Sequence, residues 1–249
     1  MSLTGTAVQR IAALADRVGA GGPARAVHQR VSPLARRNAR DDLHLQLLLA
    51  HGLQQDANCI DVGAHCGDVL EQIVRYAPDG AHLAFEPLPA QAADLRERFP
   101  GVDVHHAAVA AEAGTATFTH VVSNPQLSGL RDRGFAGESS ESFEVPVKRL
   151  DDCVDPARPV SLLKIDVEGA ELGVLEGGIE MLERDQPTVV FEHGVGGADH
   201  FGTSPGDVHD LLVGEVGLRI FDIDGEGPYS RADFERVFTE PIWFFVAHR

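Results

Sequence analysis

Predicted strands and helices alternate from residue 58 onward, and this alternation limits the possible folds more than any other feature of the sequence. Short apolar runs bounded by turn residues predict strands, and the intervening segments with apolar residues at helical spacing predict helices. This order is typical of an α/β domain with a doubly wound, mostly parallel sheet and helices on both faces. The predicted strands are 59–62, 81–87, 102–110, 161–169, 187–194, 218–224 and 242–248, and the predicted helices are 68–77, 89–99, 170–185 and 204–216.

The first 57 residues precede this alternation and predict a helical extension. The segments 6–18 and 41–53 carry apolar residues at helical spacing, and the second opens with acidic residues suited to a helix start. The segment 19–33 between them predicts a loop. A chain of 249 residues has room for one large domain with a small appendage. We therefore expect an N-terminal helical extension or cap at residues 1–57 and the main domain at residues 58–249.

Residues 114–150 interrupt the alternation. Two further strands are predicted at 114–121 and 142–150, and a loop rich in glycine and serine joins them. The insertion can be an ordinary hairpin, or its loop at 123–141 can act as a lid over a substrate, because mobile loops often carry function. The sequence favours neither interpretation.

The composition excludes several classes of protein. A formal net charge of −17 gives a surface that repels nucleic acid and anionic membranes, so we expect neither as a partner. The three cysteines do not have the spacing of a disulfide framework or of a zinc site. Residues 1–20 lack the apolar segment of a signal peptide, and no apolar run reaches the roughly 18 residues of a membrane span. We therefore expect a cytoplasmic protein.

The segment NCIDVGAHCGDVLEQI, residues 58–73, predicts a strand, a tight turn and a helix, which is a common arrangement of a cofactor site. Its glycines, Gly63 and Gly67, do not have the spacing of a dinucleotide fingerprint, and Asp61 would repel a pyrophosphate. S-adenosylmethionine carries a positive amino group and a sulfonium instead, so a carboxylate at Asp61 suits this cofactor. Glu86 ends the next predicted strand, where a carboxylate can accept hydrogen bonds from ribose hydroxyls.

Each of these carboxylates also has a structural interpretation. Asp61 or Glu86 alone could cap a turn or pair with an arginine, and dehydrogenases share an acidic residue at the position of Glu86. Both residues, however, end consecutive strands on the side of the sheet where ligands of this architecture bind. We therefore favour S-adenosylmethionine over a nicotinamide cofactor.

Longer motifs make this assignment more specific. The stretches DVGAHCGD, FEP, KRLDD, LLKIDVEGAELGVLEGG and PTVVFEH resemble the FkbM family of S-adenosylmethionine-dependent methyltransferases over about residues 58–193. The resemblance implies a class I methyltransferase fold, which is Rossmann-like and has a seven-stranded sheet with an antiparallel last strand. It also implies methyl transfer, most often to a hydroxyl of a sugar or of a polyketide-type product. The cofactor contacts that it implies come from Asp61, Gly63, Ala64, Gly67, Glu86 and, around the adenine, the segment 106–108 with Ala107.

Acidic residues and a histidine end two neighbouring predicted strands, with Asp166 and Glu168 on one and Glu192 and His193 on the other. Adjacent strands lie roughly 5 Å apart, so these four groups can converge. Carboxylates with one imidazole suit magnesium, manganese or calcium better than zinc, and a divalent metal lowers the pKa of an acceptor hydroxyl. We predict that Asp166 and Glu192 bind a metal or the substrate, and that His193 is the general base or a third metal ligand. Asp166 and His193 are thus the catalytic candidates.

Other interpretations of these residues stay open. Asp166 can serve only to hydrogen-bond the cofactor or a loop, and Glu168 can open the following helix. Glu171, one turn further, is expected to face solvent or a neighbouring arginine. Glu192 and His193 are adjacent, so on a regular strand they would point to opposite faces and one of them would be structural.

Three residues near these motifs carry further expectations. Lys164 lies in an apolar strand and is costly to bury alone. It can pair with Asp166 or another nearby carboxylate, or reach the substrate, and we favour the ion pair. His65 lies in the cofactor turn and can approach a substrate. Trp243, in the last predicted strand, is most simply part of the core.

The function that these residues favour is O-methylation of a sugar or oligosaccharide hydroxyl by S-adenosylmethionine, assisted by Mg²⁺ or another divalent cation. A hydroxyl of a polyketide or macrolide is the alternative acceptor. An NAD-dependent oxidoreductase is less favoured because the third glycine is missing, and a non-catalytic module because Asp166 and Glu192 are intact. The N-terminal helices can cap the site or form the interface of a homodimer.

Overall fold

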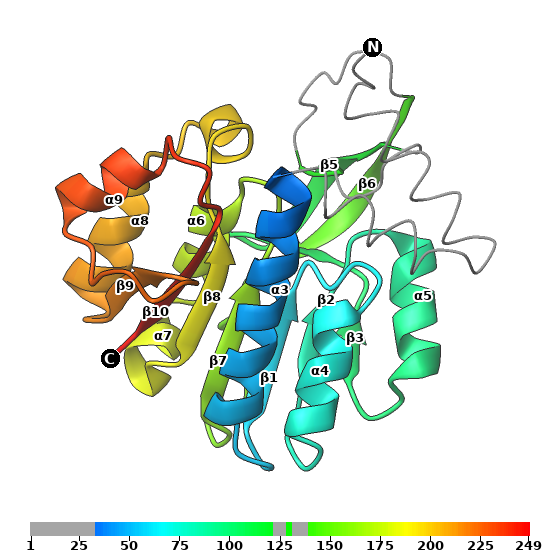
Figure 1. The fold of residues 1–249 in the computed structure, drawn as a ribbon. Coiled ribbons are helices and arrows are strands. Elements are labelled where there is room, and N and C mark those ends of the chain that lie inside the picture. Colours follow the sequence, from blue (N-terminus) through cyan, green and yellow to red (C-terminus); the bar gives the residue numbers. More distant parts are fainter. Residues whose placement is uncertain (1–32, 122–127, 131–138) are drawn as a thin grey trace. The chain divides into compact units, whose positions relative to one another are not determined.

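The computed structural model describes residues 33–121, 128–130 and 139–249, which Figure 1 shows in colour. The chain divides into two compact units, Met1–Leu48 and Leu49–Arg249. The boundary that the sequence predicts between the N-terminal extension (1–57) and the main domain (58–249) stays a prediction. Among the described residues, no helix combines the length and the apolar character that a membrane span needs.

Helix α3 (Pro33–Gly52) corrects the prediction of a helix over 41–53, because it already begins at Pro33. A proline is favourable in the first turn of a helix, where its fixed φ is suitable and its missing N–H would have no partner. The acidic residues at 41 and 42 therefore lie inside the helix, where Asp41 accepts a hydrogen bond from Arg37 at 2.9 Å. The predicted helix over 6–18 and almost all of the predicted loop after it lie outside the described residues.

Seven strands form one sheet in the order β3-β2-β1-β7-β8-β10-β9. Neighbouring strands are parallel except at β10, which runs antiparallel to both β8 and β9. This arrangement confirms the predicted doubly wound, mostly parallel sheet with a reversed last strand. The strands are β1 (Asn58–Val62), β2 (Leu83–Phe85), β3 (Asp103–His105), β7 (Val160–Ile165), β8 (Thr188–Glu192), β9 (Arg219–Asp222) and β10 (Phe244–His248).

Helices connect the parallel strands in two opposite directions along the sheet. The chain passes from β1 through β2 to β3 on one side, and from β7 to β8 on the other. Because such crossovers are right-handed, the two sets of helices cover opposite faces of the sheet. The direction reverses between β1 and β7, so ligands are expected beyond the carboxyl ends of these two strands. The helices, some of them visible at the two ends of the sheet in Figure 1, are α4 (Asp68–Tyr76), α5 (Pro89–Arg98), α6 (Glu171–Gly177), α7 (Ile179–Asp185), α8 (Pro205–His209) and α9 (Arg231–Val237).

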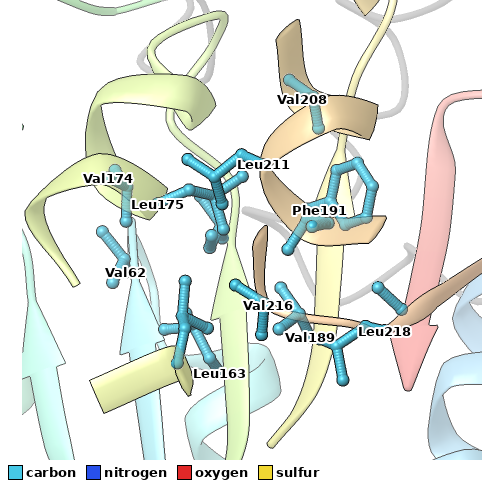
Figure 2. Packing of buried hydrophobic residues seen from close by; sticks show 14 of the residues in the cluster. Val62, Leu163, Val174, Leu175, Val189, Phe191, Val208, Leu211, Val216 and Leu218 are labelled. Carbon is cyan, nitrogen blue, oxygen red and sulfur yellow. The ribbon is translucent and has the colours of Figure 1, made fainter. Parts of the chain in front are cut away.

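The core consists of side chains from the central strands and from the helices that follow β7 and β8. All but one of the residues of β7 are buried, as is typical of a parallel strand covered on both faces. Figure 2 shows Leu163 of β7 and Phe191 of β8 in one cluster with residues of α6, of α8 and of the segment after it. This packing fixes the carboxyl ends of β7 and β8, where the predicted catalytic residues lie.

The predicted strand over 102–110 is wrong in its extent, because it consists of two strands in different sheets. β3 ends at His105, and β4 (Ala108–Val109) pairs with β6 (Ser140–Lys148) in a second sheet of order β4-β6-β5. The junction at residues 105–107 contains no glycine or proline, so the sequence does not mark the change of sheet. β5 (Gly114–Val121) and β6 are antiparallel, which confirms the two predicted extra strands. Most of the predicted lid loop lies outside the described residues.

The helices after β7 and β8 also differ from their predictions. The predicted helix over 170–185 is divided at Gly178 into α6 and α7, because glycine weakens a helix interior. The predicted helix over 204–216 is α8 followed by a π-helical turn, η3 (Asp210–Glu215). No helix is predicted at α9, although Ser230 gives it an N-cap by accepting a hydrogen bond from Asp233 N.

Candidate active site

The cofactor turn, residues 63–67, follows β1 and is held against the ends of β2 and β7. Gly63 N donates to Phe85 O at 3.0 Å. Gly63 has a φ of +76°, and a Cβ atom at this position would lie 1.8 Å from the carbonyl oxygen of Asp166. Gly67 has a φ of +82°. The turn therefore requires glycine at both positions.

Gly63→Ala is expected to lower the free energy of unfolding by about 2–5 kcal/mol, because backbone strain and overpacking each cost on the order of 1–3 kcal/mol. Urea unfolding followed by circular dichroism measures the change. Gly101→Ala is the matched control, since a Cβ atom at Gly101 meets no atom of the described residues within 4 Å. Equal stability of the two variants would contradict the tight contact between the turn and the end of β7.

Lys164 joins the cofactor turn to the end of β7. Its Nζ lies 3.0 Å from Asp61 Oδ1 and 3.8 Å from Asp166 Oδ2, and it donates to Gly63 O at 2.7 Å. Burial acts to lower the pKa of Lys164, but the charges of Asp61 and Asp166 outweigh burial and raise this pKa. The ammonium therefore stays charged. The predicted ion pair of Lys164 is confirmed, with Asp61 as the nearer partner.

The carboxylate of Asp61 is fully buried beside Lys164. Burial raises the pKa of Asp61, and the charge of Lys164 opposes this shift. Asp61 Oδ2 makes no hydrogen bond within the described part of the chain. Buried polar atoms normally have a partner, so this oxygen is suited to a positively charged group of a ligand such as the amino group of S-adenosylmethionine.

Glu86 directly follows β2 and contacts the cofactor turn. Its Oε2 accepts a hydrogen bond from His65 N at 2.7 Å, and its Oε1 accepts one from Leu88 N at 2.8 Å. Burial raises the pKa of Glu86 to about 7. Each carboxylate oxygen can accept a further hydrogen bond, which leaves room for the predicted contact with ribose hydroxyls.

The remaining residues of the predicted cofactor site are small or part of the turn itself. Ala64 and Ala107 are buried, and Ala107 lies between β3 and β4, where the chain leaves the central sheet. His65 has a φ of +46°, and burial lowers the pKa of its imidazole, which favours the neutral ring. Their contacts with a cofactor stay predictions.

Three carboxylates meet at the carboxyl ends of β7 and β8. Oxygen atoms of Asp166, Glu168 and Glu192 lie within 4.8 Å of one another, and we call these residues the carboxylate cluster. Burial, followed by the charges of Asp166 and Glu168, holds the pKa of Glu192 well above its usual range. A bound cation or a shared proton relieves such crowding, and oxygen ligands suit Mg²⁺, Mn²⁺ or Ca²⁺.

The sequence predicts His193 as the general base or a third metal ligand beside Asp166 and Glu192. In the structure, His193 does not belong to the carboxylate cluster. Its backbone N donates to Trp243 O at 2.8 Å, so the strand pairing continues beyond Glu192 and the two adjacent side chains point to different sides. The imidazole is buried and stacks on Phe234, with ring centroids 5.9 Å apart. Glu168, from the turn after β7, takes the third place in the cluster.

The expectation that Glu171 faces solvent is wrong. Glu171 is only 2% exposed, its Oε1 accepts a hydrogen bond from Gly169 N at 2.7 Å, and its Oε2 lies 3.6 Å from His193 Nδ1. Glu171 thereby holds the turn in which Glu168 has a φ of +58°. Because α6 begins only at Glu171, Glu168 does not open the helix.

A cavity of about 200 Å³ lies beside the carboxylate cluster. Glu168, Glu192 and His193 line part of it, and Trp243 and the glycine-rich segment 194–197 line much of the rest. In the described residues, neither ring nitrogen of His193 has a hydrogen-bond partner. Trp243 thus borders a cavity, which corrects the expectation that it is simply part of the core.

The fold and several motifs of this chain occur in known methyltransferases. The family described as "Methyltransferase FkbM domain" matches residues 61–220. "Methyltransferase 1" of Beauveria bassiana (strain ARSEF 2860) is 30% identical over 145 residues, which are 49% of this chain and 58% of that protein. "Methyltransferase sdnD" of Sordaria araneosa is 30% identical over 154 residues, which are 47% of this chain and 59% of that protein.

A solved structure has the same fold. The crystal structure of methyltransferase FkbM from Methylobacillus flagellatus KT superimposes with a TM-score of 0.52 at 15% identity, over 82% of this chain and 48% of that chain. The matches thus span less than two thirds of each of these three proteins. The match to the family covers well over half of this chain and includes the cofactor turn and the carboxylate cluster. The chain therefore belongs to the FkbM methyltransferase domain family.

Proposed function

We propose that this chain transfers a methyl group from S-adenosylmethionine to a hydroxyl of a sugar, with the carboxylate cluster binding a divalent cation such as Mg²⁺. One observation carries the proposal: the carboxylate cluster lies directly beside the cofactor turn. Lys164 bridges the two, since its ammonium donates to Gly63 O at 2.7 Å and lies 3.8 Å from Asp166 Oδ2. A donor in the turn and an acceptor at the cluster would therefore be neighbours, as an in-line displacement requires.

The cofactor would bind across the carboxyl ends of β1 and β2. Glu86 would accept hydrogen bonds from the ribose hydroxyls. Asp61 Oδ2, which makes no hydrogen bond among the described residues, would receive the amino group. Gly63 and Gly67 keep the turn tight against the sheet. The net charge of −17 also suits a positively charged cofactor better than a phosphorylated one.

The acceptor would bind at the carboxylate cluster. A bound divalent cation supplies a Lewis acid that lowers the pKa of the acceptor hydroxyl. Asp166, whose side chain is 33% exposed, would orient the hydroxyl and accept its proton as the new O–CH₃ bond forms and S-adenosylhomocysteine leaves. Three converging carboxylates are well suited to two adjacent hydroxyls, and for this reason we favour a sugar over a polyketide or macrolide.

Methyl transfer from radiolabelled S-adenosylmethionine tests this proposal. The acceptors are a panel of methyl pyranosides and a panel of macrolides, each assayed with Mg²⁺ and with excess chelator. We expect label in pyranosides that depends on the divalent cation. If only macrolides were labelled, the acceptor would be a macrolide and not a sugar. If the chelator left the labelling unchanged, methyl transfer would not need a divalent cation.

The affinity for S-adenosylhomocysteine is expected to depend on pH through Glu86. Its pKa of about 7 means that a rising pH ionises the carboxylate, and the ionised form accepts both ribose hydroxyls. We expect the Kd to fall about tenfold between pH 6 and pH 8 and then to level off. Calorimetric titration across this range measures the effect. Glu86→Gln, which cannot ionise, should bind more weakly and with a flat profile, and an equally steep profile in this variant would exclude Glu86 as the cause.

A further inference from the structure

We propose that the cavity beside the carboxylate cluster holds a single pyranose ring whose apolar face lies on the indole of Trp243, which makes Trp243 a specificity-determining residue. This inference rests on the proposed function and narrows its acceptor to one sugar unit. The cavity is bordered by two kinds of wall, a polar one with Glu168, Glu192 and His193 and an apolar one with Trp243.

The size of the cavity limits what can enter. Its volume of about 200 Å³ is below the roughly 300–1,000 Å³ of pockets for drug-sized ligands. A single six-membered ring matches this volume, whereas a larger acceptor such as a macrolide would enter only in part. A longer saccharide would therefore place only one unit inside.

The polar wall presents the carboxylates of Glu168 and Glu192. Both belong to the carboxylate cluster, whose oxygen atoms lie within 4.8 Å of one another. Carboxylate oxygens accept hydrogen bonds from hydroxyls, so two adjacent hydroxyls of a sugar ring can donate to this wall. The imidazole of His193 is buried against Phe234, with its Nδ1 3.6 Å from Glu171 Oε2.

The apolar wall includes Trp243 and Val195. Trp243 is only partly buried, and Val195 is 58% exposed. Gly194 makes room for the indole, because a Cβ atom there would lie 2.8 Å from Trp243 Cδ1. A pyranose has C–H groups on one face and hydroxyls at its edge. Its C–H groups can therefore pack on the indole while its hydroxyls donate hydrogen bonds to the carboxylates.

Tryptophan fluorescence observes this wall directly, since Trp243 is the single tryptophan of the chain. The full chain, with S-adenosylhomocysteine and Mg²⁺ present, is titrated with methyl glucoside, galactoside, mannoside and rhamnoside. We expect a saturable change in emission for at least one of them. Glycerol, which has adjacent hydroxyls but no ring, should give none. The absence of a saturable change with all four pyranosides would overturn the inference.

Kinetics with the responding pyranoside separate a specificity role from a structural one. Trp243→Leu should raise the acceptor KM about tenfold, with kcat and the Kd for S-adenosylhomocysteine nearly unchanged. Trp243→Phe should restore much of the loss, and Gly194→Ala should raise KM by displacing the indole. Phe221→Leu is the matched control, because Phe221 of β9 stacks on His248 and does not line the cavity.

The two hypotheses fail in different ways. An unchanged KM in Trp243→Leu, with methyl transfer intact, would overturn the role of Trp243 and leave the proposed function standing. A saturable emission change without methyl transfer to any pyranoside would support the sugar cavity and overturn the proposed O-methyltransferase function. Calorimetry with S-adenosylhomocysteine tests the cofactor separately and does not depend on Trp243.

Discussion

Lys164→Met is expected to lower the free energy of unfolding by about 3–5 kcal/mol, the cost of leaving a buried charge without its partner. Lys164 is 5% exposed and Asp61 is fully buried, so the carboxylate that remains is left buried without its nearest cation. The same ammonium also donates to Gly63 O at 2.7 Å, so the substitution removes a hydrogen bond of the cofactor turn. The effect is large because the Lys164 ammonium pairs with the carboxylates of Asp61 and Asp166 and also donates a hydrogen bond to Gly63 O.

Urea unfolding at pH 7 measures this loss, and two further variants identify its origin. Arg158→Met removes an exposed partner of Asp155, at 3.7 Å, and should change stability by less than about 1 kcal/mol. Adding Asp61→Asn to Lys164→Met removes the unpaired charge and should recover part of the loss. If Lys164→Met were no more destabilising than Arg158→Met, the buried ion pair would not stabilise the site.

Asp166→Asn is expected to reduce methyl transfer about 100-fold or more, because it removes the carboxylate that would accept the proton of the acceptor hydroxyl. The Kd for S-adenosylhomocysteine should change little, since Asp166 N, and not its side chain, holds the strand end by donating to Val62 O at 3.0 Å. Kinetics under saturating cofactor, together with calorimetry, separate the two quantities. Equal losses in both would mean that Asp166 serves the cofactor and not the acceptor.

Two glutamine variants test which residue completes the carboxylate cluster. Glu168→Gln should weaken the binding of Mn²⁺, used as a probe for Mg²⁺, because Glu168 belongs to the cluster. His193→Gln should leave Mn²⁺ binding nearly unchanged, because the imidazole lies apart among Phe234 and Phe238. Weaker Mn²⁺ binding in His193→Gln, with unchanged binding in Glu168→Gln, would instead support the ligands predicted from the sequence, which are Asp166, Glu192 and His193.

The sequence predicted the central sheet well because its strands are short apolar runs separated by clear turn residues. The helix after β7 differs from its prediction because its periodicity continues across Gly178, where α6 ends and α7 follows. The start of α3 differs because the acidic pair at 41–42 has the composition of a helix start, although Pro33 begins the helix. Local signals of this kind identify an element more reliably than they identify its ends.

The candidate site shows the same limit at the level of side chains. Lys164 could be predicted to pair, because burying an isolated ammonium is costly whatever the fold. The sequence could not predict that Glu168, and not His193, lies with Asp166 and Glu192. This arrangement depends on a left-handed backbone at Glu168 and on strand pairing that continues at His193. Nor could the sequence predict the burial of Glu171, whose partners are Gly169 N and the distant His193. Gly169 itself is a sequence signal for the tight turn, since its φ of +111° favours glycine.

The measurement that tests the account most directly is a calorimetric titration of the full chain with S-adenosylhomocysteine at pH 8 in the presence of Mg²⁺. The account predicts one site with a Kd in the micromolar range and a matching rise in Tm, because a ligand that binds only the folded state stabilises it. It also predicts that Asp61→Asn weakens this binding. No heat beyond dilution and no rise in Tm would contradict the account, since the cofactor turn would then bind no methyl donor.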